Sequence, residues 1–321
     1  MNVTHAQSST PAPKPLGSLS VSTLCLGGNV FGWTADEAES FAVLDAYVAG
    51  GGNFIDTADV YSAWVPGNKG GESETVLGNW LASRGNRDDI VIATKVGAHP
   101  DYKGLSAATI KAAVDRSLSR LRTDHIDLYY THYDDESVEV GEFLTALDDL
   151  VTAGKVREIA ASNISARRLQ ESLDFSDREG VARYVALQPE YNLVARDRYE
   201  GELADVAARN GLAAVPYYAL ASGFLTGKYR PGADVDSARS EKAAHHLATD
   251  RGRRVLAALD TVAAAHGAEH ATVALAWLAA QPTVASPIAS ARTVSQLPAL
   301  LAVQQLVLTD ADLALLTEAS A

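Results

Sequence analysis

Cysteine is almost absent from this chain of 321 residues, which contains only Cys25. A single cysteine excludes a disulfide within the chain and a cysteine-based metal site. Long apolar runs are also missing, since none approaches the roughly 20 residues needed to cross a bilayer. The first 15 residues are polar and lack the apolar stretch of a signal peptide. We therefore expect residues 1–15 to be a flexible lead-in and the protein to be cytoplasmic.

Basic residues are scarce, with 27 Lys and Arg against 40 Asp and Glu and a formal net charge of -13. Such a surface repels nucleic acid and anionic membranes, so we expect neither as a partner. An anionic ligand would need a local cluster of basic residues that offsets the negative potential of the rest of the surface. The apolar fraction of 47% is ordinary for a globular protein, and a chain of this length can bury a sizeable core.

After residue 20 the sequence alternates between short β-rich runs and segments with helical spacing. In residues 106–121, Ile110, Val114, Leu118 and Leu121 fall on one face behind Ser106, a predicted N-cap. Similar patterns predict helices at 36–49, at 138–153, where Gly154 is the expected stop, and at 196–210. The eight predicted strands are residues 23–29, 53–58, 90–96, 126–132, 158–163, 186–192, 213–219 and 284–290.

Strands that alternate with helices and are themselves almost wholly apolar predict a parallel sheet buried on both faces. Eight such units within about 270 residues suit a closed (β/α)8 TIM barrel, an α/β fold. A doubly wound sheet is the weaker alternative, because the turn after the first strand lacks the G-x-G-x-x-G pattern. No linker divides the chain, so we expect one barrel domain over residues 16–321, with long loops such as 220–246 at its C-terminal face.

Functional side chains of such a barrel lie where the strands end. Asp56 lies in the second predicted strand and Tyr61 just beyond it, while Lys95 and His132 lie at the ends of the third and fourth. A buried Lys requires a partner, and Asp56 can supply it. An ammonium beside Tyr61 would favour the phenolate and lower the pKa of the phenol from about 10. His132 could then orient a carbonyl oxygen while a hydride arrives from elsewhere.

Longer motifs surround these four residues. Residues 53–61 read NFIDTADVY, residues 71–78 read GESETVLG, and residues 126–132 read IDLYYTH. These stretches resemble the signatures of the aldo-keto reductase superfamily, and the resemblance extends from about residue 16 to 320. It implies that Asp56, Tyr61, Lys95 and His132 are the catalytic residues. It also implies reduction of an aldehyde or ketone to an alcohol, with Tyr61 as the proton donor.

The same resemblance implies a cofactor site for NADPH/NADP+. Ser162, Asn163 and Gln188 match the positions that hold the nicotinamide carboxamide, and Tyr217 matches the aromatic residue that stacks on the nicotinamide ring. The remaining matches are to the pyrophosphate loop and the adenosine-phosphate site, namely Leu220, Ser222, Gly223, Lys228, Ser290, Arg292 and Gln296. Arg suits bidentate phosphate recognition, which favours NADPH over NADH.

Trp33 and Trp64 follow the first and second predicted strands and are candidate walls of the substrate pocket, although plain packing explains them equally well. No residue set has the spacing of zinc ligands, so no metal is expected. The expected partner is a small-molecule carbonyl substrate. The alternative function is a nucleotide-binding regulatory module of the same fold, resembling channel-associated β subunits, that senses the NADPH/NADP redox state. The sequence specifies neither the individual substrate nor the oligomeric state.

Overall fold

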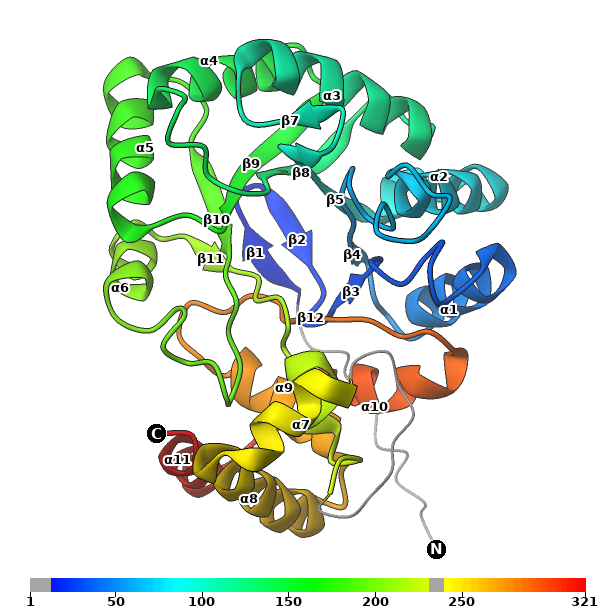
Figure 1. Cartoon of the computed structure of the whole chain (residues 1–321), viewed down its shortest axis with the longest axis vertical. Coiled ribbons are helices and arrows are strands. Elements are labelled where there is room, and N and C mark those ends of the chain that lie inside the picture. Colours follow the sequence, from blue (N-terminus) through cyan, green and yellow to red (C-terminus); the bar gives the residue numbers. More distant parts are fainter. Residues whose placement is uncertain (1–12, 231–239) are drawn as a thin grey trace, which may run out of the picture.

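The computed structural model describes residues 13–230 and 240–321, in which eight parallel strands form one curled sheet surrounded by helices (Figure 1). The strand order is β11-β10-β9-β8-β5-β4-β3-β12. Each of the eight predicted runs contributes one strand. The strands are β3 (Cys25–Gly27), β4 (Phe54–Asp56), β5 (Val91–Val96), β8 (Ile126–Thr131), β9 (Val156–Ser162), β10 (Tyr184–Gln188), β11 (Ala213–Ala214) and β12 (Ile288–Ala289).

Backbone hydrogen bonds also join the two ends of this sheet. The amide of Ala285 donates to the carbonyl of Ala214 over 2.9 Å, and the amide of Ile288 donates to the carbonyl of Pro216 over 2.9 Å. The segment leading into β12 therefore lies beside β11, as the predicted (β/α)8 barrel requires.

The helices lie outside the sheet and cover its outer face (Figure 1). The α-helices are α1 (Glu37–Ala49), α2 (Glu72–Arg84), α3 (Ala107–Leu121), α4 (Val140–Thr152), α5 (Ala166–Glu179), α6 (Glu202–Arg209), α7 (Ser240–Ala248), α8 (Asp250–His266), α9 (His270–Ala279), α10 (Leu297–Leu301) and α11 (Asp310–Ala319). Four short 3-10 helices complete the set: η1 (Arg87–Asp89), η2 (Ala221–Thr226), η3 (Val294–Gln296) and η4 (Ala302–Gln304). None of the helices in the described ranges is both long and apolar enough to span a membrane.

The predicted helix ends are confirmed at α3 and α4. The side chain of Ser106 caps α3 by accepting a hydrogen bond from the amide of Thr109, and Gly154 follows α4 with a left-handed φ of 73°. The predicted helix at 196–210 begins later, at Glu202, because Gly201 before it has a φ of 95° that interrupts the helix. Tyr199 is nevertheless buried, as its place in the pattern indicated.

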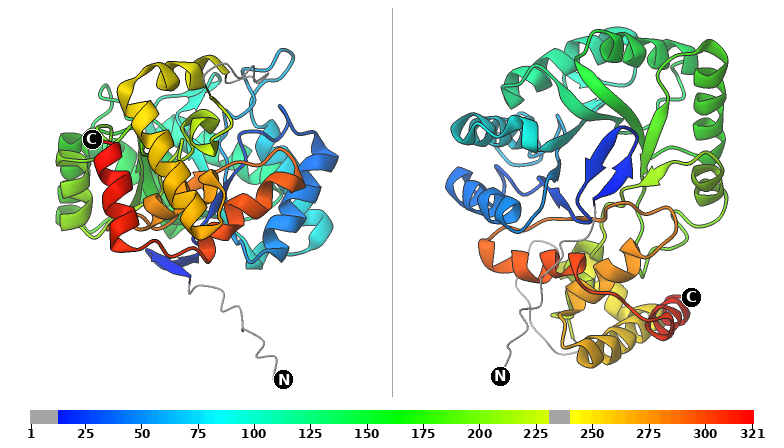
Figure 2. Two further views of the ribbon diagram at one scale, coloured as in Figure 1. Left: turned by 90° about the horizontal axis from the view of Figure 1, so that it is seen from below. Right: turned by 180° about the vertical axis from the view of Figure 1, so that it is seen from behind.

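An antiparallel hairpin of β1 (Lys14–Leu16) and β2 (Leu19–Val21) covers one end of the sheet (Figure 2). Asn53, directly before β4, accepts a hydrogen bond from the amide of Ser22, so the hairpin lies at the amino ends of the strands. The hairpin was not predicted, because its strands of three residues are too short to show a period. Residues 1–12 of the predicted lead-in lie outside the described residues, whereas Lys14 and Pro15 belong to β1.

Two connections at the opposite end carry extra structure. A small hairpin of β6 (Ala98–His99) and β7 (Tyr102–Lys103) follows β5. The predicted long loop 220–246 is instead interrupted by η2, and α7 already begins at Ser240. Residues 231–239 of this connection lie outside the described residues.

Candidate functional site

A cavity of about 780 Å³ lies where the parallel strands end. Cavities of this size accommodate small-molecule and cofactor ligands. All but one of the predicted site residues line it: Trp33, Asp56, Tyr61, Trp64, His132, Ser162, Asn163, Gln188, Tyr217, Leu220, Ser222, Gly223, Lys228, Ser290, Arg292 and Gln296. The exception is Lys95, which is fully buried and lies behind the lining residues Asp56 and Tyr61, to which it is hydrogen-bonded.

Lys95 joins the acid and the phenol of the predicted catalytic set. Its Nζ atom lies 2.7 Å from Oδ2 of Asp56 and 3.0 Å from the hydroxyl of Tyr61, and it donates a third bond to the carbonyl of Thr57 over 2.8 Å. The Tyr61 hydroxyl also donates to Oδ2 of Asp56 over 3.2 Å. All three donor positions of the ammonium are therefore used, which compensates for its burial.

The chain after β4 positions Tyr61 through a tight turn. The amide of Tyr61 donates to the carbonyl of Ala58 over 3.1 Å. The next residue, Ser62, has a φ of 72°, an uncommon value for a residue other than Gly, and is fully buried. The Ser62 hydroxyl donates to the carbonyl of Phe31, which holds this strained backbone in place. The direction of the Tyr61 side chain is thus set by hydrogen bonds on both sides of it.

The electrostatics of Tyr61 differ from the expectation based on sequence. Removal of the hydroxyl from water, followed by the negative charge of Asp56, raises the pKa of Tyr61 well above its usual value. The expected lowering by Lys95 is wrong for this site, because burial and the carboxylate act in the opposite direction and prevail. Tyr61 therefore holds its proton at neutral pH and can act as a hydrogen-bond donor.

His132 is kept neutral by its surroundings. Burial first, and the nearby charge of Lys95 second, hold the pKa of His132 well below its usual range. Its Nδ1 atom is buried and has no hydrogen-bond partner among the described residues, and its ring centroid lies 6.2 Å from that of Tyr61. A neutral imidazole can donate one hydrogen bond to an oxygen without carrying charge.

The predicted carboxamide-holding residues are linked to the same network. Gln188 donates from Nε2 to Oδ1 of Asp56 over 2.8 Å, and the hydroxyl of Ser162 donates to the backbone carbonyl of Gln188 over 2.9 Å. Asn163 donates to the backbone carbonyl of His132 over 2.8 Å and accepts from the hydroxyl of Tyr217 over 2.9 Å. These side chains come from the ends of β9, β10 and β11, so the tertiary structure places them together.

The backbone after β11 adopts an unusual conformation. Three successive residues, Ala221, Ser222 and Gly223, have φ angles of 47°, 57° and 93°. Left-handed conformations cost free energy for residues other than Gly, such as Ala221 and Ser222, and strained backbone of this kind clusters at ligand sites. Lys228 follows the segment, with its ammonium 5.0 Å from the ring centroid of Tyr229. The segment therefore presents backbone and a cation to the same side of the cavity.

The segment after β12 supplies the remaining predicted contacts. The hydroxyl of Ser290 donates to Oδ1 of Asn29 over 2.6 Å, and Oε1 of Gln296 accepts from the amide of Arg292 over 2.8 Å. The cavity thus combines three kinds of group: side-chain amides (Asn163 and Gln188), an aromatic ring (Tyr217) and two cations (Lys228 and Arg292). This combination fits a nicotinamide cofactor that bears phosphate groups.

Several lining residues were not predicted as site residues, among them Asn29 and Tyr133. Asn29 follows β3 and Tyr133 follows β8, and both line the cavity. Asn29 is the last residue of the first predicted strand, and a polar residue at a strand end is the same signal that marks the other site residues. Tyr133 directly follows His132, and this position next to a predicted catalytic residue is the only sign in the sequence that it lines the cavity.

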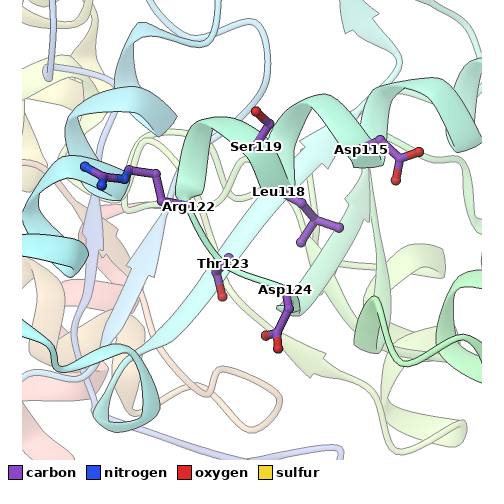
Figure 3. Close-up of a pocket in the computed structure, with 6 residues that line it drawn as sticks. All are labelled: Asp115, Leu118, Ser119, Arg122, Thr123 and Asp124. Atoms are coloured by element: carbon purple, nitrogen blue, oxygen red, sulfur yellow. The ribbon is translucent and has the colours of Figure 1, made fainter.

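Two further features bear on other kinds of site. A second depression at the C-terminal end of α3 (Figure 3) contains none of the predicted site residues and is lined by Asp115, Leu118, Ser119, Arg122, Thr123 and Asp124. Within residues 13–230 and 240–321 there is no group of three or more His, Cys, Asp or Glu side chains that could hold a metal ion.

The amino-acid sequence matches the Aldo/keto reductase family over residues 23–321. It is 35% identical to Protein tas of Escherichia coli over 311 residues, which cover 88% of this chain and 89% of that protein. It is 34% identical to Norsolorinic acid reductase B of Aspergillus parasiticus, with 92% and 80% of the two chains covered. It is also 33% identical to a probable voltage-gated potassium channel subunit beta of Arabidopsis thaliana, with 87% and 86% covered. With this match over nearly its whole length, the chain belongs to the Aldo/keto reductase family of oxidoreductases.

Proposed function

We propose that the protein reduces an aldehyde or ketone to an alcohol with NADPH, and that Tyr61 donates the proton. One observation carries the proposal: the Lys95 ammonium lies within 3.0 Å of both the Tyr61 hydroxyl and the Asp56 carboxylate beside a ligand-sized cavity. Structural ion pairs are common in proteins, but this one holds a phenol that faces the cavity. Buried ionisable groups arranged around a cavity are typical of catalytic sites.

In the proposed reaction, a nicotinamide cofactor held by Ser162, Asn163, Gln188 and Tyr217 would supply a hydride to the carbonyl carbon. The π bond of the carbonyl group breaks, and its oxygen takes the proton of Tyr61. The remaining phenolate is stabilised by the Lys95 ammonium 3.0 Å away, and the hydrogen bond to Asp56 holds that ammonium in position. Neutral His132 donates a hydrogen bond to the same carbonyl oxygen, which orients it toward Tyr61.

The preference for NADPH is supported by the cations on one side of the cavity. Arg292 and Lys228 line the cavity although the chain carries a net charge of -13. A guanidinium binds phosphate oxygens in a bidentate manner, so Arg292 suits the additional phosphate that distinguishes NADPH from NADH.

The replacement Tyr61→Phe tests the proton donor. It removes the hydroxyl and keeps the ring, so kcat should fall about 10²- to 10⁴-fold. The affinity for NADP+, measured by calorimetry, should stay close to that of the wild type. Retained turnover in Tyr61→Phe would overturn the assignment, whereas a loss of cofactor affinity would indicate a structural role.

The similarity to a probable potassium channel β subunit supports a second candidate, a module that binds the nucleotide and senses its redox state. NADPH consumption with 4-nitrobenzaldehyde separates the two functions. Steady turnover supports the reductase, and tight NADPH binding with negligible turnover supports the sensor.

A further inference from the structure

A cluster of ionisable side chains lies outside the cavity, where β5 faces α2 and α3. It contains Asp59, Glu74 of α2 and Arg120 of α3. Glu74 is fully buried and accepts hydrogen bonds from Nε of Arg120 over 2.6 Å and from the hydroxyl of Thr94 in β5 over 2.6 Å. None of these side chains lines the cavity. The reaction proposed above therefore makes no direct use of this cluster.

Asp59 is left without a partner beside groups that are already paired. Its side chain is fully buried, and neither carboxyl oxygen has a hydrogen-bond partner among the described residues. Arg120 is paired with Glu74 over 2.6 Å. Lys95 is paired with Asp56 over 2.7 Å. A buried carboxylate with neither a hydrogen bond nor a cation of its own is costly, so this arrangement favours the neutral acid.

The ionisable side chains around Asp59 belong to five elements: Glu74 (α2), Arg120 (α3), Lys95 (β5), Tyr129 (β8) and His99 (β6). Burial raises the pKa of Tyr129 well above its usual value and lowers that of His99, so both are uncharged at neutral pH. Burial is also the largest effect on Asp59 and raises its pKa to about 8. The charge of Glu74 acts in the same direction, and the two cations oppose it.

Asp59 is connected to the proposed proton donor through the backbone around Lys95. The amide of Asp59 donates to the carbonyl of Lys95 over 3.4 Å, and the Lys95 ammonium donates to the carbonyl of Thr57 over 2.8 Å. Tyr61 follows Asp59 by two residues and lies 3.0 Å from the same ammonium. A negative charge on Asp59 would therefore offset part of the positive potential that Lys95 directs at Tyr61.

We propose that Asp59 is a positioning residue for the reduction: its neutral carboxyl group leaves the positive potential of Lys95 at full strength at Tyr61, and its ionisation slows proton donation. This inference rests on the proposed reductase function. Tyr61 becomes a phenolate when it gives its proton to the carbonyl oxygen. Asp56 already places one negative charge beside Lys95, and a second one would destabilise that phenolate. The rate should therefore be highest below about pH 8 and fall as pH rises through the pKa of Asp59.

The test follows the oxidation of NADPH by 4-nitrobenzaldehyde in a single turnover, so that product release does not limit the rate. In the wild type the rate should fall about tenfold between pH 7 and pH 9.5. Asp59→Asn keeps the shape of the side chain and cannot ionise, so its rate should fall less than about threefold over this range. Asp88→Asn makes the same replacement at an exposed position and should keep the wild-type ratio. Equal ratios in the wild type and Asp59→Asn would overturn the proposal.

A second variant changes the ionisation of Asp59 without replacing it. Glu74→Gln removes the negative charge that raises the pKa of Asp59 and leaves Arg120 without its carboxylate. Asp59 should then ionise more easily, so the fall in rate should move to lower pH by about one unit or more. Structural damage alone would lower the rate at every pH without moving the pH at which it falls. A fall at the wild-type pH in Glu74→Gln would contradict the role of Asp59.

The outcome also separates this inference from the function on which it depends. Turnover that Tyr61→Phe abolishes, with the same pH dependence in the wild type and Asp59→Asn, would overturn the role of Asp59 and leave the reductase function standing. NADPH binding without turnover by the wild type at any pH would overturn both.

Discussion

Two buried aspartates three residues apart illustrate how surroundings decide the state of a side chain. Asp56 accepts hydrogen bonds from Lys95, Tyr61 and Gln188. Asp59 is equally buried, yet neither of its carboxyl oxygens has a partner within the described ranges. Burial, and then the charge of nearby Glu74, raise the pKa of Asp59 to about 8. Asp59 is therefore protonated in the folded protein at neutral pH.

The raised pKa of Asp59 makes stability depend on pH. Aspartate in an unfolded chain titrates near 4, so between about pH 4 and 8 the folded state binds the additional proton. The contribution of this group to the free energy of unfolding must then fall as pH rises through this window. Asp59→Asn is uncharged at every pH. Its free energy of unfolding, relative to that of the wild type, should therefore increase by about a few kcal/mol from pH 5 to pH 8.

Urea unfolding of the wild type and Asp59→Asn at pH 5 and pH 8 measures this difference. Asp88→Asn makes the same replacement at an exposed carboxyl and is the control. An unchanged difference for Asp59→Asn as well would show that Asp59 titrates normally.

Lys95 should matter for stability as well as for chemistry. Lys95→Met leaves the buried Asp56 carboxylate without its cation, and removal of one partner from a buried pair costs about 3–5 kcal/mol. Urea unfolding should detect this loss. The double variant Asp56→Asn with Lys95→Met removes both charges and should recover much of the stability. Equal stability of Lys95→Met and the wild type would contradict the buried ion pair.

At the scale of elements, local sequence signals determine where several helices begin. Ser106, Ser165, Thr249 and Thr309 each cap a helix by accepting a hydrogen bond from a backbone amide. The signal is reliable because a helix leaves its first amides unpaired, and a short side-chain oxygen directly before the helix can satisfy one of them.

The cap of α3 gives a test at this scale. Ser106→Ala removes the acceptor of the Thr109 amide and should lower the free energy of unfolding by about 1 kcal/mol. Ser106→Asp retains an acceptor and should stay close to the wild type. The check is chemical denaturation of the three proteins, and identical midpoints for Ala and Asp would contradict the capping role.

At the scale of the whole molecule, the cavity connects segments that are far apart in the sequence. Its lining extends from Gly27 to Gln296 and includes residues that follow most strands of the sheet. A ligand that fills it therefore stabilises the whole fold, because the unfolded chain does not bind it.

Cofactor binding should accordingly raise the thermal stability. NADP+ at about 100 times its Kd should add about 2.7 kcal/mol to the free energy of unfolding of the wild type. Arg292→Gln at the same NADP+ concentration should show a much smaller gain, while the gain with NAD+ should be the same in both proteins. Thermal denaturation with each nucleotide measures these gains. Equal NADP+ gains in both proteins would exclude Arg292 as the group that selects the phosphate.

The alternation of eight strands with helices can be predicted from the sequence alone, because periodicity and capping are local properties of the chain. The sequence also placed Asp56, Tyr61, Lys95 and His132 at strand ends, where parallel topology brings side chains together. It did not predict the β1–β2 hairpin, the late start of α6 or the helix α7 within the long connection. Each of these depends on short segments or single residues, such as Gly201, whose conformation no periodic pattern marks.

The electrostatics of the site and the residues that meet along its walls depend on the three-dimensional arrangement of the chain. From the sequence, Lys95 was expected to lower the pKa of Tyr61, whereas burial and Asp56 raise it. A continuous series of rings from Trp33 to Tyr133 likewise joins loops after three different strands. Desolvation and ring contacts depend on distances in three dimensions between segments far apart in the chain, and no local pattern in the sequence contains them.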